Sequence, residues 1–191
     1  MAPHYLVLVE GNDDQHVVRN ILRHHNISCE IAGRDRLGSD NMVVVKPKEG
    51  FENLRDTLDV ELDEPDLERL AIIVDADTDL DSRWRSLRNR LIELGAQDMP
   101  DVPGSDGLVI SVQRLTGLRT VGLWIMPDNT TSGILEHFIE FLVPAGDTLL
   151  PRARACVDHI PEHECLFREP QKAYIHTWLA WQAEPGRPLG L

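Results

Sequence analysis

The chain has 191 residues, which suits one domain with a buried core, and 42% of them are hydrophobic while 27% are charged. These fractions are typical of a folded globular protein and exclude a largely disordered one. The formal net charge of −13 at pH 7 opposes non-specific binding to nucleic acid, because that affinity comes from Lys and Arg on phosphates. A protein of this charge that acts on nucleic acid needs a metal ion, a local basic patch or a partner.

The sequence also predicts a location. It contains no uninterrupted apolar stretch of membrane-spanning length, and residues 1–4 run into a strand-like pattern without a charged leader. Three cysteines form an odd set without disulfide-framework spacing, as expected of reduced thiols. We therefore predict a cytoplasmic protein without a membrane partner.

Short apolar runs alternate with helical patterns along the first part of the chain. The predicted strands are 5–9, 42–45, 70–74 and 120–126. The predicted helices begin near Asn12, Phe51, Trp84 and Ser132, and the second of them ends before Glu64. Residues 99–107, rich in Pro, Gly and Asp, indicate an exposed loop. This alternation predicts an α/β fold with a mostly parallel central sheet and helices on both faces.

Beyond Pro144 the pattern changes to two short helical segments, 151–159 and 171–182, with loops between them. We predict an α/β domain over residues 1–145 and a small helical extension over residues 146–191, packed on the same domain.

Carboxylates close two of the predicted strands. Glu10 follows the run 5–9, and Asp75 and Asp77 follow the run 70–74. In an open α/β sheet, ligands bind beyond the carboxyl ends of the strands, so these three acids should converge there. Carboxylates that close repel one another unless a proton or a hard cation lies between them, and oxygen ligands suit Mg²⁺ or Mn²⁺. The sequence therefore predicts a divalent-metal site.

Further carboxylates could extend this site. Asp14 lies one helical turn after Glu10, and Asp79 continues the acidic run that begins at Asp75. Asp128 ends the predicted strand 120–126 on the same sheet edge, and Glu136 opens the next helix. Each also has an ordinary interpretation as a helix cap, a turn residue or a solvated side chain, and that alternative stays open.

Basic residues are needed to hold a phosphate. Lys46 and Lys48 follow the second strand and could hold a scissile phosphate, although surface exposure is an equally simple interpretation. Lys172, which opens the last predicted helix, is a third candidate. The four arginines between 83 and 90 point in several directions around a helix, so most are expected to be solvated.

The segments 9–14 (VEGNDD) and 74–79 (VDADTD) resemble the two signatures of the Toprim domain, a strand-end Glu followed by Gly and an Asp-x-Asp pair. This resemblance covers residues 4–145. Segments 127–129, 133–136 and 172–177 are also similar to small bacterial Toprim-like proteins related to overcoming-lysogenization-defect nucleases. Members of that narrower group continue beyond the point that corresponds to Leu191, which leaves room for a further terminal element.

The resemblance implies that Glu10, Asp75 and Asp77 bind catalytic Mg²⁺ or Mn²⁺, with Asp14, Asp79 and Asp128 as further candidate ligands. It implies a nuclease or other phosphodiester-processing enzyme in phage defence or nucleic-acid repair. A separately encoded ATPase partner is expected, because the chain has no phosphate-binding loop of the GxxxxGK[ST] type. The resemblance is also compatible with a homo-oligomer. The alternative is a non-catalytic regulatory or assembly subunit of an ATPase complex.

Other enzyme classes fit less well. A topoisomerase needs a nucleophilic tyrosine in a second domain, but the chain is too short and has only Tyr5 and Tyr174. A haloacid-dehalogenase phosphatase would leave Glu10 unexplained, and a receiver domain has its paired and single aspartates in the reverse order.

The spacing Cys156–His159–His163–Cys165 offers four side chains of types that Zn²⁺ accepts. We predict no zinc site, because Pro161 should end the helix before the last two residues. Cys156 is expected to pack inward and the histidines to lie near the surface.

Overall fold

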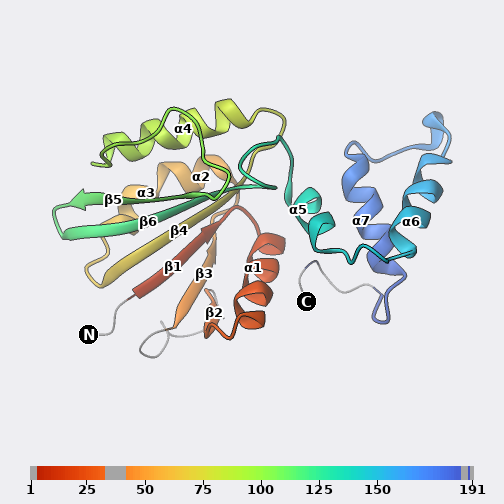
Figure 1. Ribbon diagram of the computed structural model, residues 1–191, viewed down its shortest axis with the longest axis horizontal. Coiled ribbons are helices and arrows are strands. Elements are labelled where there is room, and N and C mark those ends of the chain that lie inside the picture. The colour runs from red at the N-terminus through yellow and green to blue at the C-terminus, as the bar shows by residue number, and fades with distance from the viewer. Residues whose placement is uncertain (1–3, 33–41, 186–188, 190–191) are drawn as a thin grey trace.

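A six-stranded sheet forms the centre of the computed structural model, which describes residues 4–32, 42–185 and 189 (Figure 1). The strand order is β2-β3-β1-β4-β6-β5. The strands are β1 (His4–Val9), β2 (Cys29–Ile31), β3 (Val43–Pro47), β4 (Leu67–Asp75), β5 (Leu108–Arg114) and β6 (Gly117–Met126). All neighbouring pairs are parallel except β5 and β6. The predicted α/β fold with a mostly parallel sheet is therefore confirmed.

Two strands of the sheet, β2 and β5, lie outside the four ranges predicted from the sequence. The edge strand β5 forms an antiparallel hairpin with β6, closed by a turn in which Gly117 has a φ of +131°. Its inward positions Leu108, Ile110 and Val112 recur with period two, but Val109 between them is exposed and weakens the apolar run. Only three residues long, β2 is too short to give a periodic signal.

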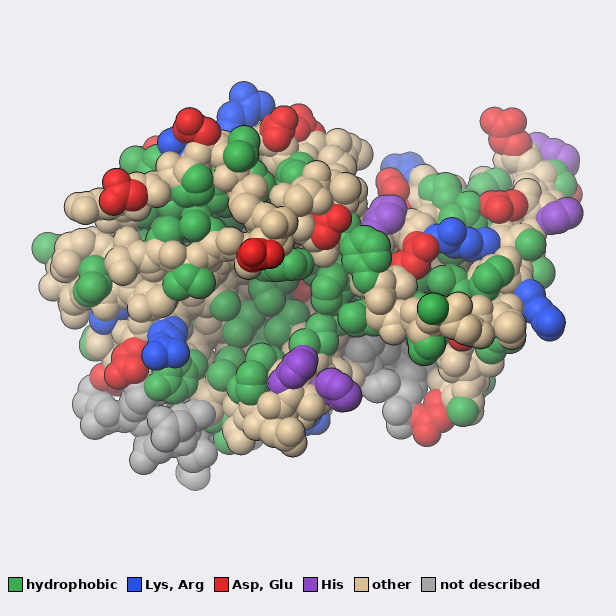
Figure 2. All heavy atoms as spheres, viewed as in Figure 1, with side chains coloured by type: hydrophobic (Ala, Val, Ile, Leu, Met, Phe, Trp, Pro, Cys, Tyr) green, Lys and Arg blue, Asp and Glu red, His purple; other side chains and the backbone are tan. Residues whose placement is uncertain are grey.

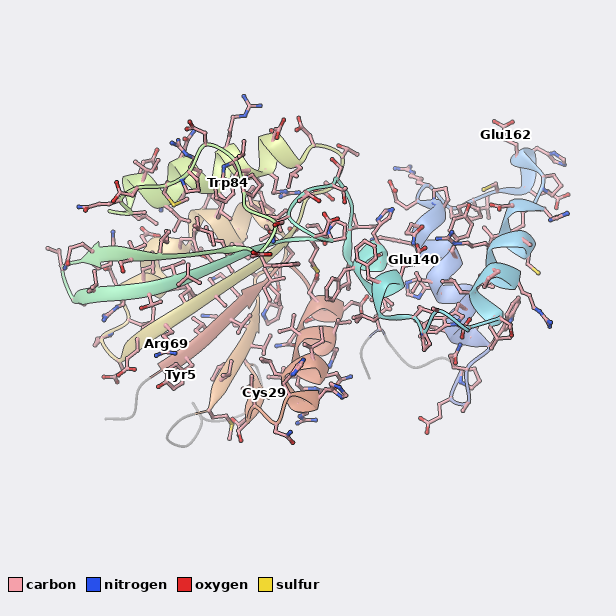
Figure 3. All side chains as sticks on the ribbon, in the orientation of Figure 1. Tyr5, Cys29, Arg69, Trp84, Glu140 and Glu162 are labelled. Carbon is pink, nitrogen blue, oxygen red and sulfur yellow. The ribbon has the colours of Figure 1, made fainter. Side chains whose placement is uncertain are left out.

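Helices lie on both faces of the sheet. On one face α1 (Asn12–His24) packs Val18 against Val7, Val9 and Val45. The other face is covered by α2 (Phe51–Asp56), α3 (Leu58–Leu62) and α4 (Leu80–Glu93). Trp84 points from α4 toward the sheet and is fully buried (Figure 3). The helix predicted from Phe51 is interrupted at Thr57, which separates α2 from α3.

The C-terminal part is helical. It comprises α5 (Leu135–Leu142), α6 (Leu149–Asp158), the 3₁₀ turn η1 (Glu162–Glu164) and α7 (Pro170–Ala180). Helices α6 and α7 lie side by side, and α5 stands between them and the sheet (Figure 1). Leu135 and Ile139 of α5 share an apolar cluster with Ile175 of α7.

The prediction that Cys156 packs inward is wrong: its side chain is exposed. Helix α6 buries Leu150, Ala153 and Val157, and Cys156 lies off that stripe. In the described ranges, no helix is both long enough and apolar enough to cross a membrane.

Candidate functional site

The carboxyl ends of β1 and β4 meet at one edge of the sheet, because these strands are parallel neighbours. Glu10 directly follows β1, and its Oε1 accepts a hydrogen bond of 2.8 Å from the backbone N–H of Asp75 at the end of β4. Two of the acids expected to converge are therefore linked by a hydrogen bond across 65 residues of sequence.

Asp14 joins them from α1. Helix α1 begins at Asn12, so its first turn carries Asp14 back over the strand end, where Oδ2 accepts a 2.9 Å hydrogen bond from the Gly11 N–H. The Asp14 side chain is buried. Its Oδ1 and the Oδ1 of Asp75 are both buried and find no hydrogen-bond partner among the residues that the structure describes. Unpaired buried carboxylate oxygens are costly, so this arrangement needs a compensating group.

The raised pKa values of these carboxyls reflect the cost of burying their charges. Burial, followed by the charges of Asp14 and Glu10, raises the pKa of Asp75 to about 8. Burial also raises the pKa of Asp14 to about 6, although its hydrogen bond from Gly11 opposes the rise. The pKa of Glu10 is raised by burial against the opposing effects of the Asp75 N–H and Arg83. We call the residues that interact in this way the carboxylate centre: Glu10, Asp14, Asp75, Asp77 and Glu136.

Asp77 is the fourth carboxylate of the centre, and it pairs with an arginine. Its backbone takes the left-handed conformation (φ +53°), and its N–H donates a 2.8 Å hydrogen bond to the carbonyl of Gly133. The Asp77 carboxylate forms an ion pair with Arg83, whose Nη1 also lies 4.0 Å from Glu10 Oε1. The guanidinium stacks 3.9 Å above the Phe51 ring. Helical spacing predicts that most of the four arginines between 83 and 90 are solvated, but only 11% of the Arg83 side chain is exposed.

Glu136 is the fifth member, and it links the carboxylate centre to α7. It lies in the first turn of α5 with 5% of its side chain exposed, and its charge raises the pKa of both Asp14 and Asp75. Nε2 of His176 on α7 lies 4.0 Å from Glu136 Oε1. No local sequence signal assigns His176 to this site, because it follows Glu136 by 40 positions and Glu10 by 166 positions.

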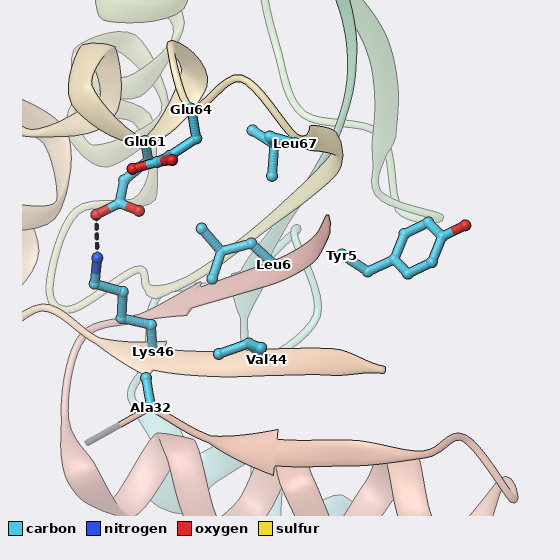
Figure 4. Close-up of a pocket in the computed structure, with 8 residues that line it drawn as sticks. All are labelled: Tyr5, Leu6, Ala32, Val44, Lys46, Glu61, Glu64 and Leu67. Atoms are coloured by element: carbon cyan, nitrogen blue, oxygen red, sulfur yellow. Dashed lines mark hydrogen bonds and ion pairs between the residues drawn. The ribbon is translucent and has the colours of Figure 1, made fainter. Parts of the chain in front are cut away.

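The two lysines expected to hold a phosphate pair with a carboxylate of α3. Nζ of Lys46 and Nζ of Lys48 approach the same oxygen of Glu61, at 2.6 and 2.8 Å. Lys46 lines a cavity of about 170 Å³ next to α3, together with Glu61 and Leu67 (Figure 4). Both ammonium groups are therefore bound by Glu61 of α3, and among the described residues neither has an ion pair with a strand-end acid.

Asp79 and Asp128 serve local structure. Asp79 caps α4 by accepting a 2.9 Å hydrogen bond from the Ser82 N–H. Asp128 accepts hydrogen bonds from the N–H groups of Thr130 and Thr131, and these contacts lower the pKa of its carboxyl against the opposing effect of burial. Neither residue is among the charges that perturb the carboxylate centre, so the capping and turn interpretations describe them better than metal ligation does.

The donor set suits a hard divalent cation, because it consists of carboxylate oxygens and includes two buried oxygens without partners. Within the described residues, however, no group of three or more His, Cys, Asp or Glu side chains is arranged so that it could hold a metal ion directly. Arg83 supplies part of the compensating charge instead. The ligand types fit, and binding would require the side chains to rearrange around the cation.

Comparison with protein families adds one finding. Residues 4–191 match the family described as "Protein of unknown function (DUF3226)". The chain belongs to this family. The match to DUF3226 includes the sheet, the carboxylate centre and α7, so the C-terminal helices are part of the family unit. Neither the curated proteins nor the solved structures gave a match.

Proposed function

We propose that this chain is a cytoplasmic, divalent-metal-dependent nuclease or other phosphodiester-processing enzyme that acts on nucleic acid. The observation that carries the proposal is the pair of buried, unpartnered oxygens on Asp14 and Asp75 within a group of five interacting carboxyls. Such a group destabilises the folded protein when it is ionised, and a cation that binds there relieves the cost.

Glu10, Asp75 and Asp77 are the proposed ligands for Mg²⁺ or Mn²⁺, with Asp14 as a further ligand on the buried side. A divalent cation there would supply charge stabilisation for the phosphoryl and leaving oxygens. The protein holds the ligands through the Glu10–Asp75 and Asp77–Gly133 hydrogen bonds. These contacts fix the backbone on which the carboxylates sit, as a preorganised site requires.

Arg83 is the proposed phosphate-binding residue of the centre. Its guanidinium lies beside Asp77 and Glu10 and is supported by the face of Phe51. A planar guanidinium can bind two phosphate oxygens at once, which a lysine ammonium cannot do. Arg83 therefore replaces Lys46 and Lys48 in this role.

The resemblance to Toprim proteins supports a role in phage defence or nucleic-acid repair. It also supports a separately encoded ATPase as partner, and it is compatible with a homo-oligomer. A second candidate function is a non-catalytic subunit of such an ATPase complex. The Arg83–Asp77 ion pair favours it, because a cation from the protein itself already neutralises part of the centre.

A cleavage assay separates the two functions. Labelled single-stranded and double-stranded DNA and RNA are incubated with the full chain in Mg²⁺, in Mn²⁺ and in chelator. The nuclease proposal expects metal-dependent cleavage that is abolished in the Asp75→Ala/Asp77→Ala double variant and retained in Asp79→Asn, since Asn caps a helix as well as Asp does. Undiminished cleavage by the double variant would refute the assignment of the site. If the chain binds metal but cleaves no strand, either alone or with the ATPase partner present, the result would favour the non-catalytic subunit.

A further inference from the structure

Helix α7 carries a polar side chain to the carboxylate centre from outside residues 4–145, the range over which the chain resembles the Toprim domain. His176 has 54% of its side chain exposed, and its Nε2 faces the buried Glu136 carboxylate at 4.0 Å. The imidazole therefore stands at the surface above a buried acid. In Figure 2, basic, acidic and histidine side chains lie together on the side of the α6–α7 pair that faces the sheet.

The position of α7 relative to α5 is set by further contacts. Glu140, labelled in Figure 3, lies one turn after Glu136 on α5. Its carboxylate accepts a 2.5 Å hydrogen bond from Gln171 of α7 and forms an ion pair with Arg154 of α6. Ile175, the neighbour of His176, is fully buried against the apolar cluster of α5. Helix α7, which carries His176, is thus held against α5 by a polar contact and by apolar packing.

A phosphate that approaches the carboxylate centre meets strong negative charge and needs hydrogen-bond donors at the rim. Lys46 and Lys48 are bound by Glu61, and Arg83 lies on the α4 side next to Asp77. His176 lies on α7, beside Glu136. One ring nitrogen faces Glu136, and the exposed remainder of the ring is open to a ligand. Asp14, buried with an unpartnered oxygen, marks the interior of the same site.

We propose that His176 contacts a backbone phosphate of the nucleic-acid substrate, so that α7 forms the second wall of the substrate site. This inference rests on the proposed nuclease function and adds a residue to it. Glu136 orients the imidazole, and the ring donates a hydrogen bond to a phosphate oxygen next to the scissile bond. Lys172, one turn earlier on α7, lies on the same helical face and extends this wall.

The test compares His176→Gln with His163→Gln in the full chain. His163 is an exposed histidine on η1 that pairs only with the neighbouring Glu164 among the described residues, which makes it a matched control. The probe is a fluorescein-labelled single-stranded DNA, and an RNA of the same sequence, titrated by anisotropy in Ca²⁺ to limit turnover. Steady-state cleavage in Mn²⁺ and thermal unfolding with and without Mn²⁺ are measured on the same preparations.

His176→Gln should weaken binding of the labelled strand by about 5- to 10-fold, the size of one charge-assisted phosphate contact, and raise KM more than it lowers kcat. His163→Gln should change neither, and the stabilisation by Mn²⁺ should be the same in all three proteins. His176→Lys should recover part of the lost affinity.

Two results overturn the inference alone. Binding and KM of His176→Gln equal to those of the unmodified chain would show that the residue makes no substrate contact. A loss of Mn²⁺ stabilisation in this variant would show that His176 supports the fold or the metal ligands instead. Failure of the unmodified chain itself to bind or cleave any strand with metal would overturn the proposed function and the inference with it.

Discussion

The substitution Asp75→Asn should stabilise the protein in the absence of metal. The pKa of Asp75 is raised to about 8, mainly by burial and then by Asp14 and Glu10, from an ordinary value of 3.8. The folded state therefore holds a proton on this carboxyl over a pH range in which the unfolded chain has lost it. The contribution of this group to stability is fully present below pH 3.8 and is lost as the pH rises toward 8.

The expected size follows from the same two values. Asp75 is ionised in the unfolded chain above pH 3.8, so it must take up a proton when the protein folds. At pH 7 this proton uptake lowers the free energy of unfolding by up to about 4 kcal/mol, and at pH 5 by about 1.5 kcal/mol. An Asn side chain avoids this cost, and its amide can donate toward the neighbouring carboxylates. The stability advantage of Asp75→Asn should thus shrink by about 2.5 kcal/mol between pH 7 and pH 5.

Urea unfolding in chelator at pH 5, 6 and 7 measures this difference, with Asp79→Asn as the matched control. Asp79 caps α4 outside the carboxylate centre, so its replacement should change stability little and without a trend in pH. Added Mn²⁺ should reverse the order, because the cation stabilises the unmodified chain by mass action and the Asn variant less. An advantage that is absent at pH 7, or that does not depend on pH, would refute the reasoning about the buried carboxyl.

Three further predictions use other parts of the molecule. Arg83→Met should lower stability in chelator, since it removes the cation next to Asp77 while the aliphatic packing on Phe51 remains, and saturating Mn²⁺ should restore most of the loss in urea unfolding. The isolated chain should bind nucleic acid weakly in chelator at physiological salt and more tightly with divalent metal; tight binding in chelator, measured by anisotropy, would contradict this and indicate a basic surface. Elemental analysis of protein purified without added metal should find no stoichiometric zinc, and zinc lost together in the Cys156→Ser/Cys165→Ser variant would contradict this.

The sequence predicts the acids at the strand ends because their signal is local. An apolar run ends in a carboxylate, and parallel neighbours bring such ends together whatever the rest of the chain does. Glu10 and Asp75 follow this rule, and their hydrogen bond shows the result. Asp14 follows from helical spacing in the same way, since it needs only that α1 begins in the turn.

The sequence does not predict the ion-pair partners of the basic residues, because these partners are distant in the sequence. Lys46 occupies the same face of β3 as Val44, and that face lies under α3, where Glu61 captures the ammonium group. Spacing around a helix also failed for Arg83: it is partly buried by Phe51, a residue 32 positions earlier on a different helix. Which cation reaches which carboxylate depends on how helices are placed over the sheet, and apolar periodicity does not specify that.

Helix α5 joins the two halves of the molecule in a way that has consequences for function. Glu136 in its first turn belongs to the carboxylate centre, and Glu140 one turn later binds Gln171 of α7 and Arg154 of α6. A cation at the centre would change the electrostatic surroundings of Glu136 and of its neighbour His176 while Glu140 keeps α7 in place. The C-terminal helices are therefore coupled to the candidate site through one short, packed helix, and substitutions in α7 should be assayed for substrate binding as well as for stability.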